Sequence, residues 1–107
     1  MTVEIKPRSE KECRHVFLAA YRPPTVGDPN WYVEIPAVEG CFSSGKTRDE
    51  AGENIIEALT NHSLKKPLSI REVMQMDSME CVYKSGYQGF EFVIGTAVVQ
   101  VQPIEDQ

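Results

Sequence analysis

Cysteine and histidine are the residue types of this chain that could bind zinc or act as nucleophiles. Cys13 and His15 are separated by one residue, while Cys41 and Cys81 lie far along the chain. Thiolates and imidazole nitrogens are preferred zinc ligands, but one Cys-x-His spacing is a weak indication of a zinc site. No third residue can be named that would orient a Cys–His nucleophilic pair. We therefore expect small core cysteines, a surface histidine, and neither a metal nor a cofactor.

A row of glutamates, Glu50, Glu53 and Glu57, is the candidate for binding a partner. Like charges at i,i+3 and i,i+4 destabilise a helix by roughly 0.2–0.5 kcal/mol per pair, and no lysine or arginine on that face offsets them. A basic protein surface would relieve this repulsion. The alternative is a solvated face whose acidic start is favoured by the helix dipole. Trp31 is either a sheet residue covered by the helix or an exposed anchor of an interface.

The length, composition and net charge limit the classes of protein to which this chain can belong. A chain of 107 residues with 41% hydrophobic residues forms one domain with a single core. The net charge of −5 argues against a free-standing binder of duplex DNA and suits a basic protein partner. Three cysteines without an apolar N-terminal segment favour a cytoplasmic location, and no apolar run is long enough to cross a membrane. Lys65, Lys66 and Arg71 form a small basic cluster, which we expect to be a solvated helix end.

Three strands are expected before the helix. Residues 15–22, HVFLAAYR, are apolar at nearly every position, as in a strand covered on both faces. A loop rich in proline follows over 23–30, and residues 31–35 form an aromatic, β-branched strand that ends at Pro36. Trp31, Val33 and Ile35 share one face of this strand, and Tyr32 and Glu34 share the other. A tight turn at Gly40 leads to a third strand over 41–45, in which Phe42 and Ser44 face away from Cys41 and Ser43.

The segment that holds the glutamates is predicted to be an amphipathic helix. Thr47 and Glu50 form a capping box at its start. Its buried stripe is Ala51, Ile55, Ala58, Leu59 and His62. Gly52 lies near the edge of that stripe, and close packing against the sheet would explain a glycine there.

The C-terminal part is predicted to hold a short helix and a long strand. Ser69 and Glu72 form a second possible capping box, opening a helix through about Met76, although a strand over the same residues is the alternative. Residues 90–101 are the longest strand signal, with Gly95 as a bulge or a point of close approach. Unless its edge is covered, this strand could pair with another copy, which predicts a homodimer or higher homo-oligomer. The residues assigned to that edge are Phe90, Phe92, Ile94 and Val98.

These elements, in this order, resemble the HicB-like antitoxin domain over roughly His15 to Pro103. The matching positions are Gly27, Ile35-Pro36, Gly40-Cys41, Gly45, Thr47, Glu50-Ala51, Asn54 and Glu57-Ala58-Leu59. The resemblance implies an α+β fold similar to a partial RNase H fold: an antiparallel three-stranded sheet, a crossing helix and a further C-terminal strand. It divides the chain into a lead-in over 1–14, a HicB-like domain over 15–103 and an acidic tail over 104–107.

The resemblance also implies a partner. HicB-like proteins bind and silence a HicA-type toxin, a small basic RNA-cleaving protein, and most carry a C-terminal DNA-binding segment. This chain departs from that pattern, because only a strand and an acidic tail follow Phe90. We therefore expect no direct DNA binding.

Enzymatic activity is not expected. A nuclease of the RNase H type needs converging carboxylates, one of them on the first strand, and residues 15–22 contain no Asp or Glu. Glu34 is a lone strand carboxylate. The expected function is that of a non-enzymatic antitoxin that covers the toxin's RNA-binding surface. The alternatives are a regulatory or inhibitory module, of mobile-element origin, acting on an unrelated protein, and a structural dimerisation module.

Overall fold

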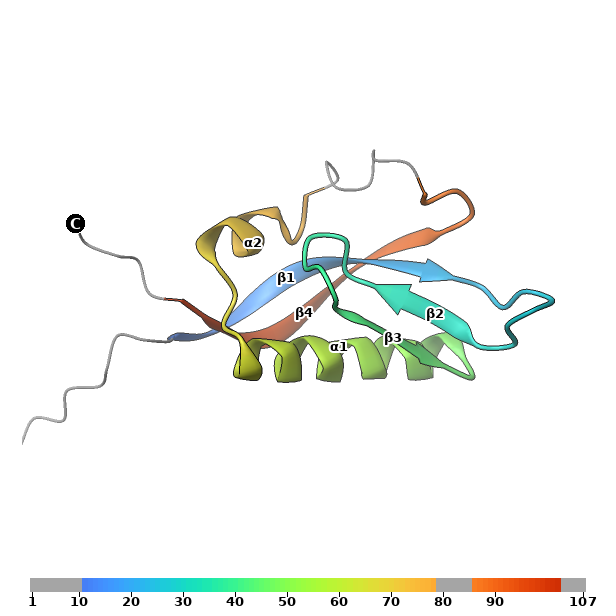
Figure 1. Cartoon of the computed structure of the whole chain (residues 1–107), viewed down its shortest axis with the longest axis horizontal. Coiled ribbons are helices and arrows are strands. Elements are labelled where there is room, and N and C mark those ends of the chain that lie inside the picture. The colour runs from blue at the N-terminus through green and yellow to red at the C-terminus, as the bar shows by residue number, and fades with distance from the viewer. Residues whose placement is uncertain (1–10, 79–85, 103–107) are drawn as a thin grey trace, which may run out of the picture.

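The computed structural model describes residues 11–78 and 86–102, which form an α+β fold of four strands and two helices (Figure 1). The elements in chain order are β1 (Lys11–Arg22), β2 (Trp31–Glu34), β3 (Phe42–Gly45), α1 (Arg48–Lys65), α2 (Ile70–Gln75) and β4 (Glu91–Val101).

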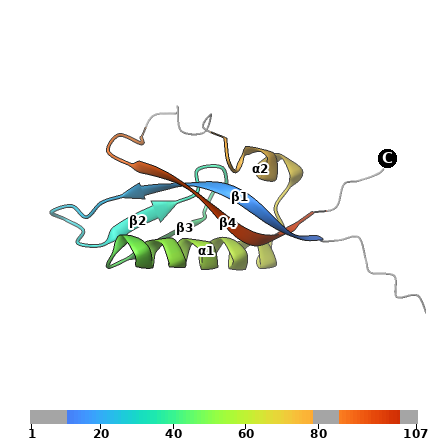
Figure 2. The ribbon, with the colours of Figure 1, turned by 180° about the vertical axis from the view of Figure 1, so that it is seen from behind.

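The four strands form one antiparallel sheet in the order β3-β2-β1-β4. The expected further strand thus pairs with β1, so the sheet has four strands instead of three. β1 and β4 pair from Lys11↔Val101 to Tyr21↔Glu91 without interruption, whereas β2 pairs only with residues 20–22 of β1. The sheet is therefore a short four-stranded end that continues as a long, curled β1–β4 ribbon (Figure 2).

β1 begins earlier than the sequence predicted, at Lys11 instead of His15. The pattern before His15 is polar and gives no strand signal, but β4 offers backbone partners as far as Val101. The long-range pairing with β4 therefore extends the strand into residues 11–14.

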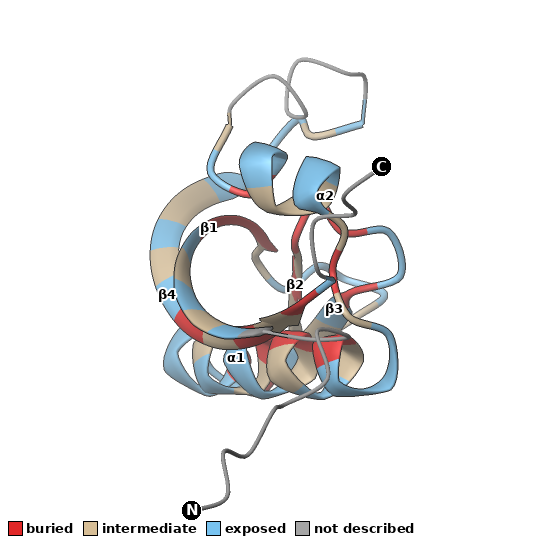
Figure 3. Cartoon of the chain, turned by 90° about the vertical axis from the view of Figure 1, so that its left-hand side faces the viewer, coloured by how far each residue is buried: buried red, intermediate tan, exposed pale blue. Residues whose placement is uncertain are grey.

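Helix α1 packs against one side of the sheet, and α2 lies on the other side of β1 (Figure 3). The core joins the inward residues of the sheet to the buried stripe of α1, with Val33, Ile55, Leu59, Leu68 and Met76 almost fully buried. The segment after α2 is tied to β1, because the Leu18 amide donates a hydrogen bond to the Met76 carbonyl at 2.6 Å.

Local signals placed both helices correctly. The Thr47 hydroxyl accepts a hydrogen bond from the Glu50 amide at 3.0 Å, but the Glu50 carboxylate accepts from the Lys46 amide instead of completing the box on Thr47. Ser69 and Glu72 form the complete reciprocal capping box of α2, which confirms the helix over the strand alternative. Gly40 has a φ of 84°, as the tight turn before β3 requires.

The last turn of α1 differs from the predicted stripe, because Ser63 is fully buried and His62 is not. The Ser63 hydroxyl donates to the Thr60 carbonyl at 2.9 Å and accepts from the Gln100 amide of β4 at 3.0 Å. A serine whose hydroxyl has hydrogen-bond partners can occupy a core position. The pattern of apolar residues does not indicate such a position.

Replacing Ser63 by alanine is expected to lower the free energy of unfolding by about 1–3 kcal/mol, because the Gln100 amide loses its acceptor in the interior. Urea unfolding followed by circular dichroism would measure the loss. Ser44→Ala, at an exposed position of β3, is the matched control. Equal unfolding midpoints for the two variants would contradict the role of Ser63 as the link between α1 and β4.

Candidate protein-binding surfaces

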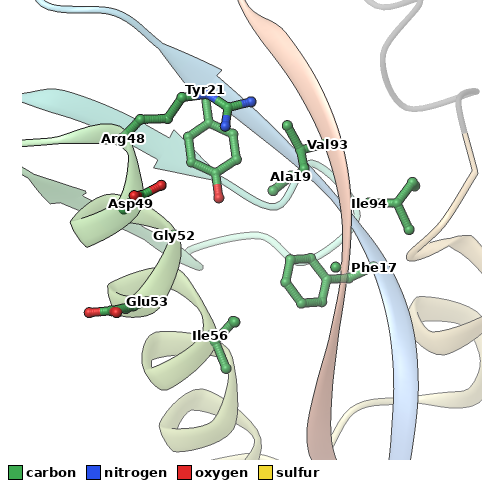
Figure 4. A pocket seen from close by; sticks show the side chains of 11 residues that line it. Phe17, Ala19, Tyr21, Arg48, Asp49, Gly52, Glu53, Ile56, Val93 and Ile94 are labelled. Atoms are coloured by element: carbon green, nitrogen blue, oxygen red, sulfur yellow. The ribbon is translucent and has the colours of Figure 1, made fainter.

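The exposed face of α1 carries unneutralised acidic side chains. Glu53 and Glu57 are exposed, and within the described part of the chain neither makes a hydrogen bond or an ion pair. Glu50 is different, because its carboxylate is held by the Lys46 amide at 2.7 Å. Figure 4 shows Glu53 pointing away from the sheet and Ile56 pointing toward it. Of the three predicted glutamates, Glu53 and Glu57 are therefore the ones free to meet a partner.

The one basic residue in the first turn of α1 does not neutralise that face. Arg48 donates to the Glu91 carboxylate of β4 at 3.0 Å, and its guanidinium lies 5.2 Å from the centre of the Tyr21 ring. Its charge is thus directed toward the sheet, which leaves Glu53 and Glu57 unopposed. We call Glu53 and Glu57 the acidic face of α1.

Trp31 is half-buried and packs against the core. It shares a face of β2 with Val33, as the strand alternation predicted, and this face is the one toward α1. Its surroundings are those of a sheet residue next to the helix, so most of its ring is already in contact within the chain.

A cluster of aromatic rings covers the opposite side of the sheet, and the sequence analysis missed it. We name these residues the aromatic cluster: Tyr32, Phe42, Tyr87, Phe90 and Phe92. Ring centres of neighbouring members are 5.2–6.4 Å apart. Phe42 is 60% exposed, so the cluster is open to solvent at the β3 edge. Five of the nine aromatic residues of the chain lie in this cluster and not in the hydrophobic core.

Polar groups hold this cluster in place. The Glu34 carboxylate accepts hydrogen bonds from the hydroxyls of Tyr32, at 2.7 Å, and Tyr87. Burial and the adjacent Glu34 raise the pKa of Tyr32 to about 12, so its hydroxyl stays protonated and donates. Arg22 lies 5.3 Å from the centre of the Tyr32 ring and pairs with Asp28 at 2.6 Å. The result is a fixed platform with aromatic rings and one arginine, residue types enriched in protein interfaces.

A groove runs between the first half of α1 and β4, with a volume of about 370 Å³ (Figure 4). Phe17 and Val93 line its floor, and Gly52, Glu53 and Ile56 line its helix side. A β-carbon on Gly52 would lie 2.9 Å from the Tyr21 hydroxyl, which confirms the close packing expected at this glycine.

Gly95 is a point of close approach. A β-carbon there would lie 2.8 Å from the Phe17 ring, and the β1–β4 register passes through it without a bulge. Among the residues predicted to form a dimer edge, Ile94 is 55% exposed. The Val98 carbonyl, in contrast, already accepts a hydrogen bond from the Thr60 hydroxyl of α1. Phe90 lies one residue before the start of β4.

The cysteines are dispersed. Cys41 is buried, and burial raises the pKa of its thiol to about 11. Cys13 is half-buried against the core, and Cys81 lies outside the described residues. Among the residues that the structure describes, no three of His, Cys, Asp and Glu are close enough to hold a metal ion. Neither of the two described helices has the length and apolar character needed to cross a membrane.

Comparison with known proteins finds a partial relative. A stretch of 41 residues is 49% identical to UPF0150 protein Ta0767 of Thermoplasma acidophilum, which amounts to 36% of this chain. The match spans 59% of the length of that relative, less than two thirds of it. No protein-family model and no solved structure matches the chain.

Proposed function

We propose that this protein is a non-enzymatic antitoxin of the HicB-like type, which neutralises a small basic RNA-cleaving toxin by covering its RNA-binding surface. The observation that carries the proposal is the 49% identity over 41 residues to a UPF0150 protein, because UPF0150 is the HicB-like family and occurs in a toxin–antitoxin context. The α+β fold with its four-stranded antiparallel sheet agrees with the fold expected for that family.

The acidic face of α1 is the contact we assign to the toxin. Glu53 and Glu57 are one helical turn apart, and a pair of like charges at this spacing is unfavourable in the free protein. Lysine or arginine side chains that bind RNA phosphates would pair equally with these carboxylates. Binding would therefore relieve repulsion on α1 and mask the toxin's cationic surface at once. Such an antitoxin needs no chemistry of its own.

Affinity purification of the tagged full-length chain from its native lysate, followed by an RNA-cleavage assay of the eluted proteins, tests this function. We expect a small basic protein that cleaves RNA when separated from this chain and stops when one equivalent is added back. An eluted partner without RNA-cleaving activity, or one whose activity is unaffected by this chain, would contradict the proposal.

The aromatic cluster favours a second candidate function, that of an inhibitory or regulatory module acting on an unrelated protein. Phe42 and its neighbours offer an apolar contact that needs no basic partner. The two functions respond differently to salt, because ionic contacts between exposed groups are screened at high ionic strength while apolar contacts are not. A complex that survives 1 M salt would favour the second function.

A further inference from the structure

β4 is an edge strand of the sheet, and only part of its outer backbone edge is hydrogen-bonded within the described residues. β4 is the last strand in the order β3-β2-β1-β4, and its even-numbered residues direct their amides and carbonyls away from β1. At one end these groups are satisfied within the chain: Thr60 donates to the Val98 carbonyl, Ser63 accepts from the Gln100 amide, and Leu68 pairs with Gln100 and Gln102. In the part of β4 that precedes Val98, Phe92, Ile94 and Thr96 have no such partner among the described residues.

Residues 92–99, all within the described part of β4, carry none of the features that oppose pairing with another strand. Exposed edges are normally protected by charged residues, proline or a bulge. Residues 92–99, FVIGTAVV, contain no charge and no proline, and the register with β1 is continuous across them. Valine, isoleucine, phenylalanine and threonine all favour extended strands. The open edge therefore has the properties of an interface strand.

We propose that two copies of this chain pair through the open edge of β4 as antiparallel strands, with Ile94 on the two-fold axis. The unpaired backbone groups determine this register. The Val98 carbonyl already accepts a hydrogen bond from Thr60 of α1, so the described residues whose outer backbone groups remain unpaired are Phe92, Ile94 and Thr96, and Ile94 is the middle one. Phe92 then pairs with Thr96 of the second copy, Ile94 pairs with Ile94, and the two four-stranded sheets become one continuous sheet. The pairing is the same from either copy, as a two-fold dimer requires.

The side chains fit the same register. Odd-numbered residues of β4 face α1, so Val93 of one copy lies opposite Gly95 of the other on that side. Gly95 has no side chain, and the Phe17 ring, which lines the groove with Val93 and Ile56, packs closely over it. Val93 of the second copy would lie opposite Gly95 and add an apolar side chain next to this packed pair. On the other side of the sheet, the two Ile94 side chains, each 55% exposed in the single chain, contact one another.

The proposed strand pairing joins the two β4 edges and needs neither residue of the acidic face of α1: Glu53 borders the groove on its helix side, but its carboxylate points away from the sheet (Figure 4), and Glu57 is exposed one turn farther along the helix. The dimer inference therefore stands independently of the antitoxin proposal. A strand from a different protein could occupy the same edge, and the experiments below separate that outcome from self-pairing.

Sedimentation equilibrium of the purified full chain measures the association. We expect a dimer for the unchanged chain and at least about a tenfold weaker association for Ile94→Glu, because like charges directly opposite each other in paired strands repel. Val26→Glu is the matched control, since it makes the same replacement at a fully exposed loop position, and it should remain dimeric. A monomeric unchanged chain, or a dimer indifferent to Ile94→Glu, would overturn the proposal.

Disulfide cross-linking tests the register. In a background carrying Cys13→Ser and Cys81→Ser, Ile94→Cys places two thiols on residues whose α-carbons lie about 5.5 Å apart, within disulfide reach. Thr96→Cys is the matched control, because in this register its two copies are four residues apart along the strands, about 14 Å. Oxidation should cross-link the Ile94→Cys variant and leave the Thr96→Cys variant as single chains. Equal cross-linking of both would reject Ile94 as the axis.

Discussion

Replacing Gly45 by alanine is expected to lower the free energy of unfolding by about 3 kcal/mol, the upper end of what overpacking costs. A β-carbon at Gly45 would lie 2.5 Å from the Ala51 nitrogen and 2.9 Å from the Glu50 carbonyl carbon. Both atoms belong to the backbone of the first turn of α1, so no rotamer change can relieve the contact. The turn itself is pinned by the Thr47 cap, which leaves separation of β3 from α1 as the remaining response.

Chemical unfolding of Gly45→Ala and Gly27→Ala would measure this effect against a matched replacement. Gly27 is exposed, and a β-carbon there would meet nothing within 4 Å. Since a domain of this size is stable by only about 5–15 kcal/mol, the Gly45 variant should show a clearly lower unfolding midpoint and the Gly27 variant should not. Similar midpoints would show that the first turn of α1 can move away from β3 at little cost.

Features set by neighbouring residues were predictable from the sequence. The Thr47 cap, the Ser69–Glu72 capping box and the turn at Gly40 each depend on a few consecutive residues, and all three are present. Strand alternation likewise placed Trp31 and Val33 on a common face, and in the structure that face is the one toward α1. Periodicity suggested that Gly52 packs closely on the sheet, and the Tyr21 hydroxyl is the group it meets.

Features that depend on strand order were not predictable in the same way. The aromatic cluster joins residues from β2, β3, β4 and the turn before β4, and only the order β3-β2-β1-β4 and its register bring them together. Tyr32 and Phe42 were assigned to faces correctly, but no local pattern links them to Tyr87. The burial of Ser63 was not predicted for a related reason: it depends on a hydrogen bond from the Gln100 amide, which belongs to a strand distant in the sequence.

The acidic face was predictable in outline but not in detail. Glu50, Glu53 and Glu57 share a helix surface by spacing alone, yet the Lys46 amide binds Glu50 and withdraws it from that surface. Side-chain hydrogen bonds to the backbone at a helix start compete with contacts to a partner. The free charge of the face is therefore carried by Glu53 and Glu57, and these two residues are the ones to change.

The variant Glu53→Lys/Glu57→Lys is expected to bind the proposed small basic toxin about 10- to 100-fold more weakly, because two attractive charge contacts become repulsive. Isothermal titration calorimetry with the toxin would measure the change. The free energy of unfolding should be nearly unaffected, since the double reversal replaces one like-charged pair at i,i+4 by another.

The single variant Glu57→Lys separates the effect on stability from the effect on binding. It places a lysine four residues after Glu53, which should stabilise α1 by a few tenths of a kcal/mol while still weakening binding.

A global change in charge could imitate this loss, so the control must change the net charge equally at another place. Glu39→Lys/Asp77→Lys does so, because both residues are exposed, one in the turn between β2 and β3 and the other after α2. We expect this control to slow association slightly through the long-range field and to leave the dissociation rate unchanged. Equal weakening by both double variants would mean that the toxin responds to overall charge, and unchanged affinity in Glu53→Lys/Glu57→Lys would exclude α1 as the contact. A loss confined to Glu53→Lys/Glu57→Lys would assign the toxin to the acidic face.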